Sequence, residues 1–194
     1  MSVAIIPARG QSKRIPRKNI RMFHGKPIIA YSIQTAQQSG LFDDVYVSTE
    51  DLEIADIARQ YYAYVIIRPD ALAEIGAPDC GSQEVTRDAL VHIGTTGVNP
   101  VYACCIYATA PLMTANDLRH GFEMLRESVG PFAYSVDISG VDAGQWYWGT
   151  RDAFIRRVPL AQGVKVQIPE NRVCDINTEE DWMRAERMYV EGRP

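Results

Sequence analysis

The sequence lacks a long apolar run, a high cysteine content and an excess of positive charge. No stretch of its 194 residues approaches the about 20 apolar residues that a membrane-spanning helix needs, and no signal-peptide pattern opens it. Its four cysteines (Cys80, Cys104, Cys105 and Cys174) have neither metal-ligand spacing nor the density of a disulfide scaffold. A net charge of −4 argues against general nucleic-acid affinity. We therefore expect a cytoplasmic protein that binds neither membrane nor nucleic acid.

Two common nucleotide-binding fingerprints are also absent. The sequence has no Gly-x-x-x-x-Gly-Lys-Ser/Thr motif, which excludes the usual P-loop. It has no Gly-x-Gly-x-x-Gly motif either, so a dinucleotide-binding oxidoreductase is a poor match. Any nucleotide site in this chain is therefore built from other residues.

What the sequence does contain is a regular alternation of strand and helix. Nearly half of the residues (46%) are apolar, which suits one globular domain over residues 1–194. We expect strands at 3–6, 45–49, 64–67, 101–107, 132–136, 145–148 and 164–168, and helices at 27–36, 50–60, 83–93, 117–127 and 178–189. The alternation predicts an α/β, three-layer, Rossmann-like fold with a mostly parallel sheet. The apolar run that contains Cys104 and Cys105 is typical of a strand buried on both faces.

Residues 9–19 follow the first strand as a turn crowded with cations, which we call the basic loop. Six of its eleven residues are Arg, Lys or Asn. Gly10 permits backbone geometry that a side chain would forbid, and Ser12 can donate a hydroxyl hydrogen bond. A strand end that presents backbone N–H groups, a hydroxyl and cations is suited to holding a polyphosphate. A solvated basic turn is the alternative, and the position directly after a buried strand favours the phosphate site.

Polar residues follow several of the other expected strands as well. In open α/β folds the ligand lies over the carboxyl ends of the strands. The residues at these ends are 9–18, Ser48, Thr49, Arg68, 107–111, those from 136 onward and Asp175. They bring cations, hydroxyls and a carboxylate to one rim. The residues alone therefore predict a site for a phosphorylated small molecule.

Several motifs resemble those of the sugar nucleotidylyltransferases, and more closely the cytidylyltransferases that activate nine-carbon acidic sugars. In that family the loop reads Ala-Arg-Gly-Gly-Ser-Lys and then Pro-x-Lys-Asn. Here residues 8–13 read ARGQSK and residues 16–19 read PRKN. The segments GKPIIAYS (25–32), VSTE (47–50) and RP (68–69) match at the same relative places. IYATAP (106–111) and DAGQWYWG (142–149) resemble the pseudaminic acid branch of the family.

The resemblance implies that the anomeric hydroxyl of the sugar attacks the α-phosphate of CTP and that pyrophosphate leaves. Such a reaction needs charge neutralisation and in-line positioning. The implied catalytic cations are Arg9, Lys13 and Lys18, and the implied CTP-binding residues are Ala8, Gly10, Ser12, Asn19, Arg68 and Ser82. Of these, Asn19 and Arg68 would hold the nucleoside, and Ser82 is a weaker candidate for reading cytosine. Arg68 precedes a proline, so it could instead cap a strand.

The resemblance also implies an acceptor site and a metal site. Tyr107, Thr109, Gln145 and Tyr147 are the candidates to contact the sugar, whereas the tryptophans at 146 and 148 are expected to be structural. Asp175 opens a segment that resembles the Asp-x-Asp metal motif of the family, and its carboxylate suits Mg²⁺ (or Mn²⁺). The second acid is replaced by Asn177, which brings no charge and is equally well placed as a helix N-cap.

The chain departs from the family pattern in two places. Gln11 stands where the family has a second glycine. Relatives also carry some tens of residues, which contribute to a dimer arm and to the acceptor pocket, where this chain has only residues 137–141. Either that segment is absent, or the sequence joins residues across an omitted stretch; the matches on both sides favour an omitted stretch.

We expect from the resemblance a homodimeric pseudaminic acid cytidylyltransferase. Legionaminic or sialic acid is an alternative acceptor within the same class. A nucleotide-binding protein without turnover is an alternative of another class, because Gln11, Asn177 and the short connection all depart from the family.

Overall fold

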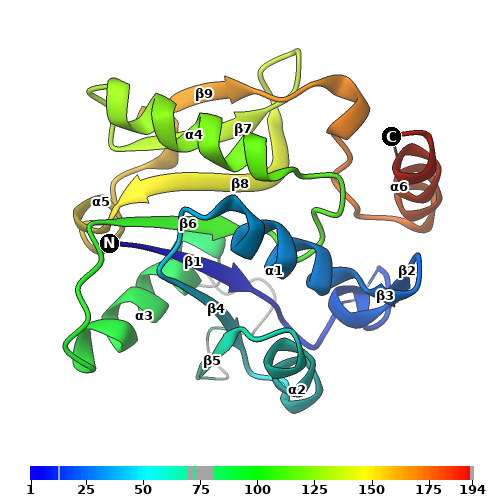
Figure 1. Ribbon diagram of the computed structural model, residues 1–194, viewed down its shortest axis with the longest axis horizontal. Helices are drawn as coiled ribbons and strands as arrows, with labels where there is room; N and C mark the ends of the chain where they lie inside the picture. Colours follow the sequence, from blue (N-terminus) through cyan, green and yellow to red (C-terminus); the bar gives the residue numbers. More distant parts are fainter. Residues whose placement is uncertain (13, 70–71, 73–80, 193–194) are drawn as a thin grey trace.

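A single seven-stranded sheet organises the computed structural model, which describes residues 1–12, 14–69, 72 and 81–192 (Figure 1). The strand order is β5-β4-β1-β6-β8-β7-β9. The strands are β1 (Ser2–Pro7), β4 (Asp44–Thr49), β5 (Tyr64–Ile67), β6 (Tyr102–Ile106), β7 (Phe132–Val136), β8 (Asp142–Thr150) and β9 (Val164–Gln167). β8 runs antiparallel to β6 and β7, and the other neighbouring pairs are parallel. The prediction of a mostly parallel sheet is confirmed.

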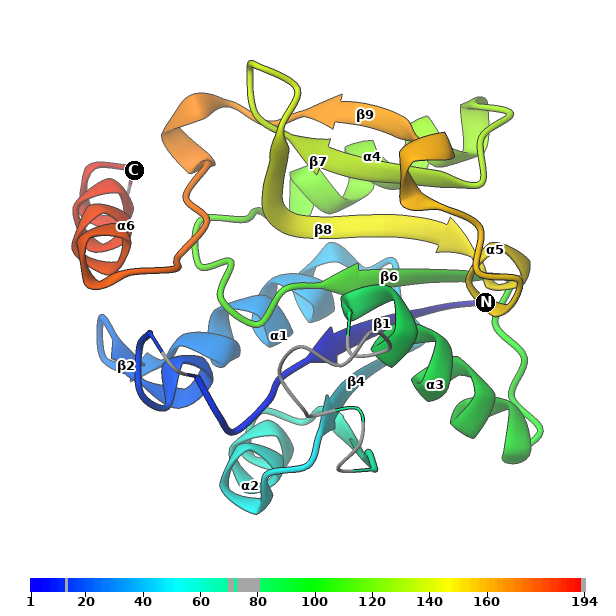
Figure 2. The ribbon, with the colours of Figure 1, turned by 180° about the vertical axis from the view of Figure 1, so that it is seen from behind.

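Helices cover both faces of the sheet (Figures 1 and 2). On one face lie α1 (Ile28–Ser39), α2 (Leu52–Gln60) and α4 (Ala115–Glu127), and on the other lie α3 (Ser82–Thr95) and α5 (Arg151–Ile155). Alternate residues of β1 divide between the two cores: Ile6 packs with the first set of helices and Ile5 with the second. This is the three-layer arrangement that the alternating pattern predicted. Within the described ranges, no helix is long and apolar enough to cross a membrane.

The central strands are buried from both sides. Cys104 and Cys105 are fully buried in β6 and face opposite cores, as expected for a two-sided strand. Trp146 and Trp148 of β8 are also fully buried, and the Trp148 indole N–H donates to the Leu118 carbonyl at 3.0 Å. Both tryptophans therefore belong to the core, as the sequence indicated.

The C-terminal helix α6 (Glu179–Glu191) packs away from the sheet faces, against the small hairpin of β2 (Met22–Phe23) and β3 (Lys26–Pro27). Trp182 is buried beside Phe23, with ring centroids 5.5 Å apart. Thr178 and Asp181 form a capping box at the start of α6. The N-cap is thus Thr178, and the interpretation of Asn177 as the N-cap was wrong by one residue.

Three single 3₁₀ turns complete the described elements: η1 (Lys18–Ile20), η3 (Leu160–Gln162) and η4 (Glu170–Arg172). The first lies within the basic loop and continues toward the hairpin of β2 and β3. The third leads from β9 to the segment before α6. η1 and η4 therefore lie in or next to two segments that the sequence assigned to the rim, the basic loop and the segment of Asp175.

The connection between β7 and β8 is a turn of residues 137–141. One oxygen of the Asp137 carboxylate accepts from the backbone N–H groups of Ser139 (2.8 Å) and Val141 (2.9 Å). The Asp137 N–H in turn donates to the Val141 carbonyl at 2.8 Å, and Val136 pairs with Asp142. Five residues thus suffice to join the two strands.

We expect Gly121→Ala to destabilise the fold, because a Cβ there would lie 2.2 Å from the Cη2 atom of Trp146. Overpacking of this kind costs about 1–3 kcal/mol, and the better helix propensity of Ala regains at most about 1 kcal/mol. The urea midpoint should therefore fall. Gly130→Ala is the control, because the nearest atom to its Cβ would be 3.5 Å away. Equal midpoints for both variants would contradict this packing of α4 on β8.

Candidate functional site

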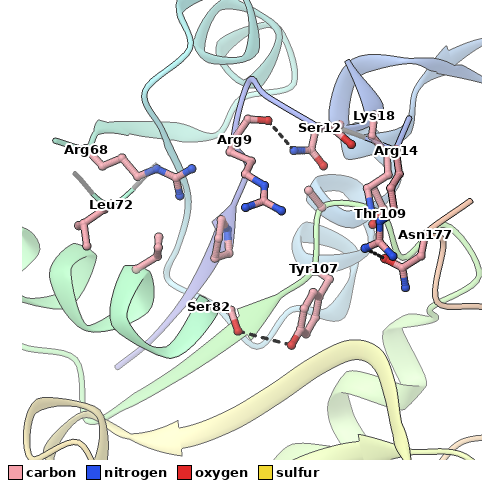
Figure 3. Close-up of a pocket in the computed structure, with 14 residues that line it drawn as sticks. Arg9, Ser12, Arg14, Lys18, Arg68, Leu72, Ser82, Tyr107, Thr109 and Asn177 are labelled. Carbon is pink, nitrogen blue, oxygen red and sulfur yellow. Dashed lines mark hydrogen bonds between the residues drawn. The ribbon is translucent and has the colours of Figure 1, made fainter. Parts of the chain in front are cut away.

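A cleft of about 510 Å³ lies over the carboxyl ends of β1, β5 and β6 (Figure 3). Its walls come from the basic loop, the residues after β5 and β6, the start of α3 and the segment before α6. The lining residues are Pro7, Arg9, Ser12, Arg14, Lys18, Asn19, Arg68, Leu72, Ser82, Val85, Tyr107, Ala108, Thr109 and Asn177. The rim predicted from the strand ends is therefore a real concave surface.

The cleft has two chemically different sides. Figure 3 shows Arg68, Leu72 and Ser82 on one side and Lys18 and Asn177, with Arg14, on the other. The first side combines apolar walls with a hydroxyl and one guanidinium, which suits a flat heterocyclic ring. The second side is cationic, which suits a polyanion.

The basic loop is held in shape by hydrogen bonds to its own backbone and to the turn after β4. Asn19, which is 8% exposed, donates from Nδ2 to the Arg9 carbonyl at 2.9 Å. The Gly10 N–H donates to Oε1 of Glu50 at 2.7 Å. A Cβ on Gly10 would lie 2.3 Å from Oδ2 of Asp51, so only glycine fits at this position.

Three carboxylates after β4, Glu50, Asp51 and Glu53, form what we call the acidic turn. Arg17 donates to both Asp51 oxygens at 2.5 and 3.0 Å and to Glu53 at 2.6 Å. The hydrogen bond from Arg17 is the main reason why the pKa of the Asp51 carboxyl lies below its usual range. Arg17 does not line the cleft, so it anchors the basic loop from behind.

Lys18 lies at the cationic side of the cleft and donates from Nζ to the Ile176 carbonyl at 2.6 Å. Burial is the main cause that lowers the pKa of Lys18, the positive charges of Arg14 and Arg9 lower it further, and Asp175 opposes them. An anion bound in the cleft would therefore stabilise the protonated amine.

Arg68 is buried, with its side chain only 3% exposed, and it pairs with Glu50. Its Nε and Nη2 donate to Oε2 of Glu50 at 3.0 and 2.7 Å. The Arg68 backbone N–H continues the pairing with β4 by donating to the Thr49 carbonyl at 3.1 Å. The guanidinium is thus fixed at the cleft wall by a carboxylate and does not cap a strand.

The cleft also contains two of the four predicted sugar contacts. Tyr107 and Thr109 follow β6, and the Tyr107 hydroxyl lies 3.4 Å from Oγ of Ser82. Burial raises the pKa of Tyr107, so this phenol is a neutral hydrogen-bonding group near neutral pH.

Tyr147, a further predicted sugar contact, is 1% exposed and does not line the cleft. Gln145, the fourth predicted contact, does not line it either. It is 2% exposed, and its amide Nε2 donates to the Arg172 carbonyl. Its backbone carbonyl accepts from the Tyr107 N–H at 2.8 Å, so it lies directly behind a lining residue. Among the described residues its Oε1 atom is buried without a hydrogen-bond partner. A ligand N–H or O–H that reached this oxygen would satisfy it.

The remaining predicted residues occupy different positions. Ala8, which precedes the basic loop, and Gly10, which belongs to it, are buried behind the lining. Lys13 lies outside the described residues. Arg14, which the predicted rim included without an individual role, also lines the cleft, as does Asn177. The density of cations in the basic loop was the signal that placed Arg14 in that rim.

Asp175 is an exposed carboxylate next to the cleft, and it has the chemistry of a magnesium ligand. Asn177 donates from Nδ2 to Asp175 at 2.5 Å and accepts from Arg14 at 2.7 Å on Oδ1. Partial burial raises the pKa of Asp142, and the negative charge of Asp175 adds to that rise, so the two carboxylates are near neighbours. In the part of the chain that the structure describes, no group of three or more His, Cys, Asp or Glu side chains is arranged so that it could hold a metal ion. One carboxylate plus substrate phosphates is a common way of holding Mg²⁺, and Asp175 fits it.

Residues 3–143 match a family model described as Cytidylyltransferase. The chain belongs to this family. The pseudaminic acid cytidylyltransferase of Campylobacter jejuni subsp. jejuni is 32% identical to this cytidylyltransferase, over 97% of this chain and 96% of its own length. That alignment runs over 225 positions, which exceeds the 194 residues of this chain, so the Campylobacter protein carries residues that this one lacks.

Solved structures confirm the fold of this cytidylyltransferase. A CMP:2-keto-3-deoxy-manno-octonic acid synthetase complexed with CTP superposes with a TM-score of 0.75, at 14% identity and 99% coverage of both chains. A protein of Mycobacterium tuberculosis H37Rv, solved as a complex with manganese, gives a TM-score of 0.69 at 15% identity, covering 96% of this chain and 97% of its own. At such identities the likeness establishes the fold alone.

We expect the stability contributed by the Asp51 carboxylate to be lost in acid. Because its pKa is lowered by folding, this contribution is present above the unfolded pKa of about 3.9 and disappears as the pH falls through the lower folded value. Asp51→Asn retains a good N-cap, so it isolates the ion pair. At pH 7 the variant should be less stable by about 1 kcal/mol, a figure discounted for screening at the 40% exposed Arg17.

Urea unfolding of both proteins at several pH values measures this difference. Asp56→Asn is the control, because its exposed pair with Arg59 lies on the same helix. A difference between wild type and Asp51→Asn that stays constant from neutral to strongly acidic pH would contradict the assignment.

Proposed function

We propose that this cytidylyltransferase transfers CMP from CTP to the anomeric hydroxyl of pseudaminic acid, a nine-carbon acidic sugar, and releases pyrophosphate. The observation that carries this proposal is the match to the Campylobacter enzyme along nearly the whole of both chains. The two-sided cleft supports it, because CTP has a flat base at one end and a triphosphate at the other.

The triphosphate binds on the cationic side, to Arg9, Ser12 and Lys18, with Lys13 from the same loop. Phosphoryl transfer of this kind needs positive charge and in-line positioning more than covalent catalysis. The lysines supply mobile point charges, and Arg9 supplies a two-pronged donor. Ala8 and Gly10 lie behind the lining and act by shaping the loop, since the Gly10 N–H is bound to Glu50 and the missing side chain leaves room for Asp51.

The nucleoside binds on the other side, to Arg68, Ser82 and Asn19. Arg68 and the Ser82 hydroxyl offer hydrogen bonds to the polar edge of cytosine, and the apolar side chains of Leu72 and Val85 offer contact to the ring face. Asn19, which also fixes the Arg9 carbonyl, belongs to the junction of the two sides.

The sugar binds to Tyr107 and Thr109 in the cleft and to Gln145 behind them. The unpaired Oε1 of Gln145 supports this assignment, because a sugar hydroxyl or amide can donate to it. Asp175 holds Mg²⁺ (or Mn²⁺), which when bound supplies positive charge to phosphate oxygens. Asn177 orients the Asp175 carboxylate and Arg14 through its two hydrogen bonds.

We further infer that residues 1–194 form one domain and that the enzyme is a cytoplasmic homodimer. The free thiols of Cys104, Cys105 and Cys174 fit a reducing compartment.

We expect pyrophosphate release from CTP only when a nonulosonic acid is present, and fastest with pseudaminic acid. A coupled pyrophosphate assay with pseudaminic, legionaminic and sialic acids measures the preference, and CTP alone is the control. A higher kcat/KM with legionaminic or sialic acid would transfer the assignment to that acceptor. Tight CTP binding without release for any acceptor would show a binding protein without turnover.

We expect Asp175→Asn to weaken binding of the divalent cation to the CTP complex by about tenfold or more, because the amide removes a charged ligand. Titration of Mn²⁺ into the protein with CTP, followed by electron paramagnetic resonance, measures this independently of turnover. Asp152→Asn, a charge change on the exposed surface of α5, is the matched control. Equal Mn²⁺ affinity for both variants would remove Asp175 from the metal site.

A further inference from the structure

Glu50 joins the two sides of the cleft through a single carboxylate, although sequence patterns gave it no role. Its Oε1 accepts the Gly10 N–H of the basic loop at 2.7 Å. Its Oε2 accepts from Nη2 and Nε of Arg68 at 2.7 and 3.0 Å. The side chains of Glu50 and Arg68 are only 14% and 3% exposed, so this link is shielded from water.

A carboxylate is an unexpected neighbour for a triphosphate site. Its negative charge opposes the binding of another anion at close range. It also takes up the Gly10 N–H, a donor of the kind that phosphate-binding loops offer to their ligands. If only its electrostatic effect on a bound triphosphate counted, Glu50 would be unfavourable at this position. Another physical reason must explain why a carboxylate lies here.

The reason lies in what Glu50 does to Arg68. Because two donors of the guanidinium meet one carboxylate oxygen, the plane of the guanidinium is fixed at the cleft wall. The carboxylate also offsets the charge of Arg68, so this arginine acts as an oriented donor for a neutral acceptor such as a base carbonyl. The triphosphate is left to the cations on the other side of the cleft.

The same carboxylate fixes the distance between the basic loop and Arg68. The two ends of CTP are covalently joined, so a site for the whole nucleotide must keep its two halves at one separation. We propose that Glu50 is a positioning residue that holds the basic loop and Arg68 in register, so that base and triphosphate are bound together. This inference rests on the proposed function, since it takes CTP as the ligand.

Glu50→Gln tests this inference by removing one of the two acceptor oxygens together with the charge. Glu53→Gln is the matched control, because Glu53 belongs to the same acidic turn, is 67% exposed and pairs with Arg17 behind the loop. Isothermal titration gives the Kd of each protein for CTP, for inorganic tripolyphosphate and for cytidine. Thermal melts show whether each variant is folded.

We expect the Kd for CTP to rise by about tenfold or more in Glu50→Gln, while the Kd for tripolyphosphate changes by less than about threefold or falls. The fall would come from removing a like charge. Cytidine should lose less affinity than CTP, and Glu53→Gln should match wild type. If Glu50 only supported folding, Glu50→Gln would lower the melting temperature but would not weaken the binding of CTP more than that of tripolyphosphate or cytidine.

Three results would overturn the inference. The first is a folded Glu50→Gln variant that binds CTP as well as Glu53→Gln does. The second is a loss for tripolyphosphate as large as that for CTP. The third is loss of the cooperative melt in both Glu50→Gln and Glu50→Asp. The Asp variant retains the charge that offsets Arg68, but its side chain is one methylene too short to reach both partners. Its Kd for CTP should therefore also rise more than its Kd for tripolyphosphate.

The wild-type measurements separate this inference from the proposed function. If wild type neither binds CTP nor releases pyrophosphate, the proposed function fails and Glu50 loses its role with it. If wild type binds and turns over CTP while Glu50→Gln is unchanged, only the role of Glu50 fails.

Discussion

The contact between the basic loop and the acidic turn is the interaction on which the rest of the cleft depends. The basic loop carries five cations among eleven residues, and like charges at this density repel one another. The carboxylates after β4 supply the opposing charge, and the parallel pairing of β1 with β4 brings the two turns to the same edge of the sheet. Gly10 lets them approach closely, since a Cβ at this position would lie 2.3 Å from Oδ2 of Asp51. The sheet thus builds the cleft by placing two oppositely charged turns side by side.

The arginines of this region fall into two groups, those that pair with a carboxylate and those that line the cleft. Arg17 and Arg68 are paired with carboxylates, which largely neutralise their charges within the protein. Arg9 and Arg14 line the cleft with Lys18, whose pKa is lowered mainly by burial and further by these two cations. The charges that hold the fold together and the charges that line the cleft are therefore different residues, and each group can be varied with less effect on the other.

The sequence predicted the fold well because most strands are buried on two faces and carry an unambiguous apolar run. Most strand and helix positions follow the expected ranges, but β8 extends beyond its expected range at both ends, and α5 and the hairpin of β2 and β3 were not predicted. The antiparallel placement of β8 between β6 and β7 depends on pairing between distant residues. Within the site, local motifs located the basic loop, Arg68 and Tyr107. Glu50 was missed because its partners lie 40 and 18 residues away and nothing local marks a bridging carboxylate. The direction in which the Gln145 side chain points depends on the positive φ of the preceding Gly144. Residue types alone do not predict that backbone conformation.

The short turn between β7 and β8 has a consequence for how such enzymes diversify. Asp137 closes that turn through exposed backbone groups, and no core side chain takes part. A hairpin tip of this kind accepts additional residues without altering the register of its strands. Relatives with longer chains can thus be lengthened at this tip, and because the tip follows the carboxyl end of β7, which runs parallel to β1 and β6, the added residues would lie at the same edge of the sheet as the cleft. The tip behaves as an exchangeable module on an otherwise fixed catalytic frame.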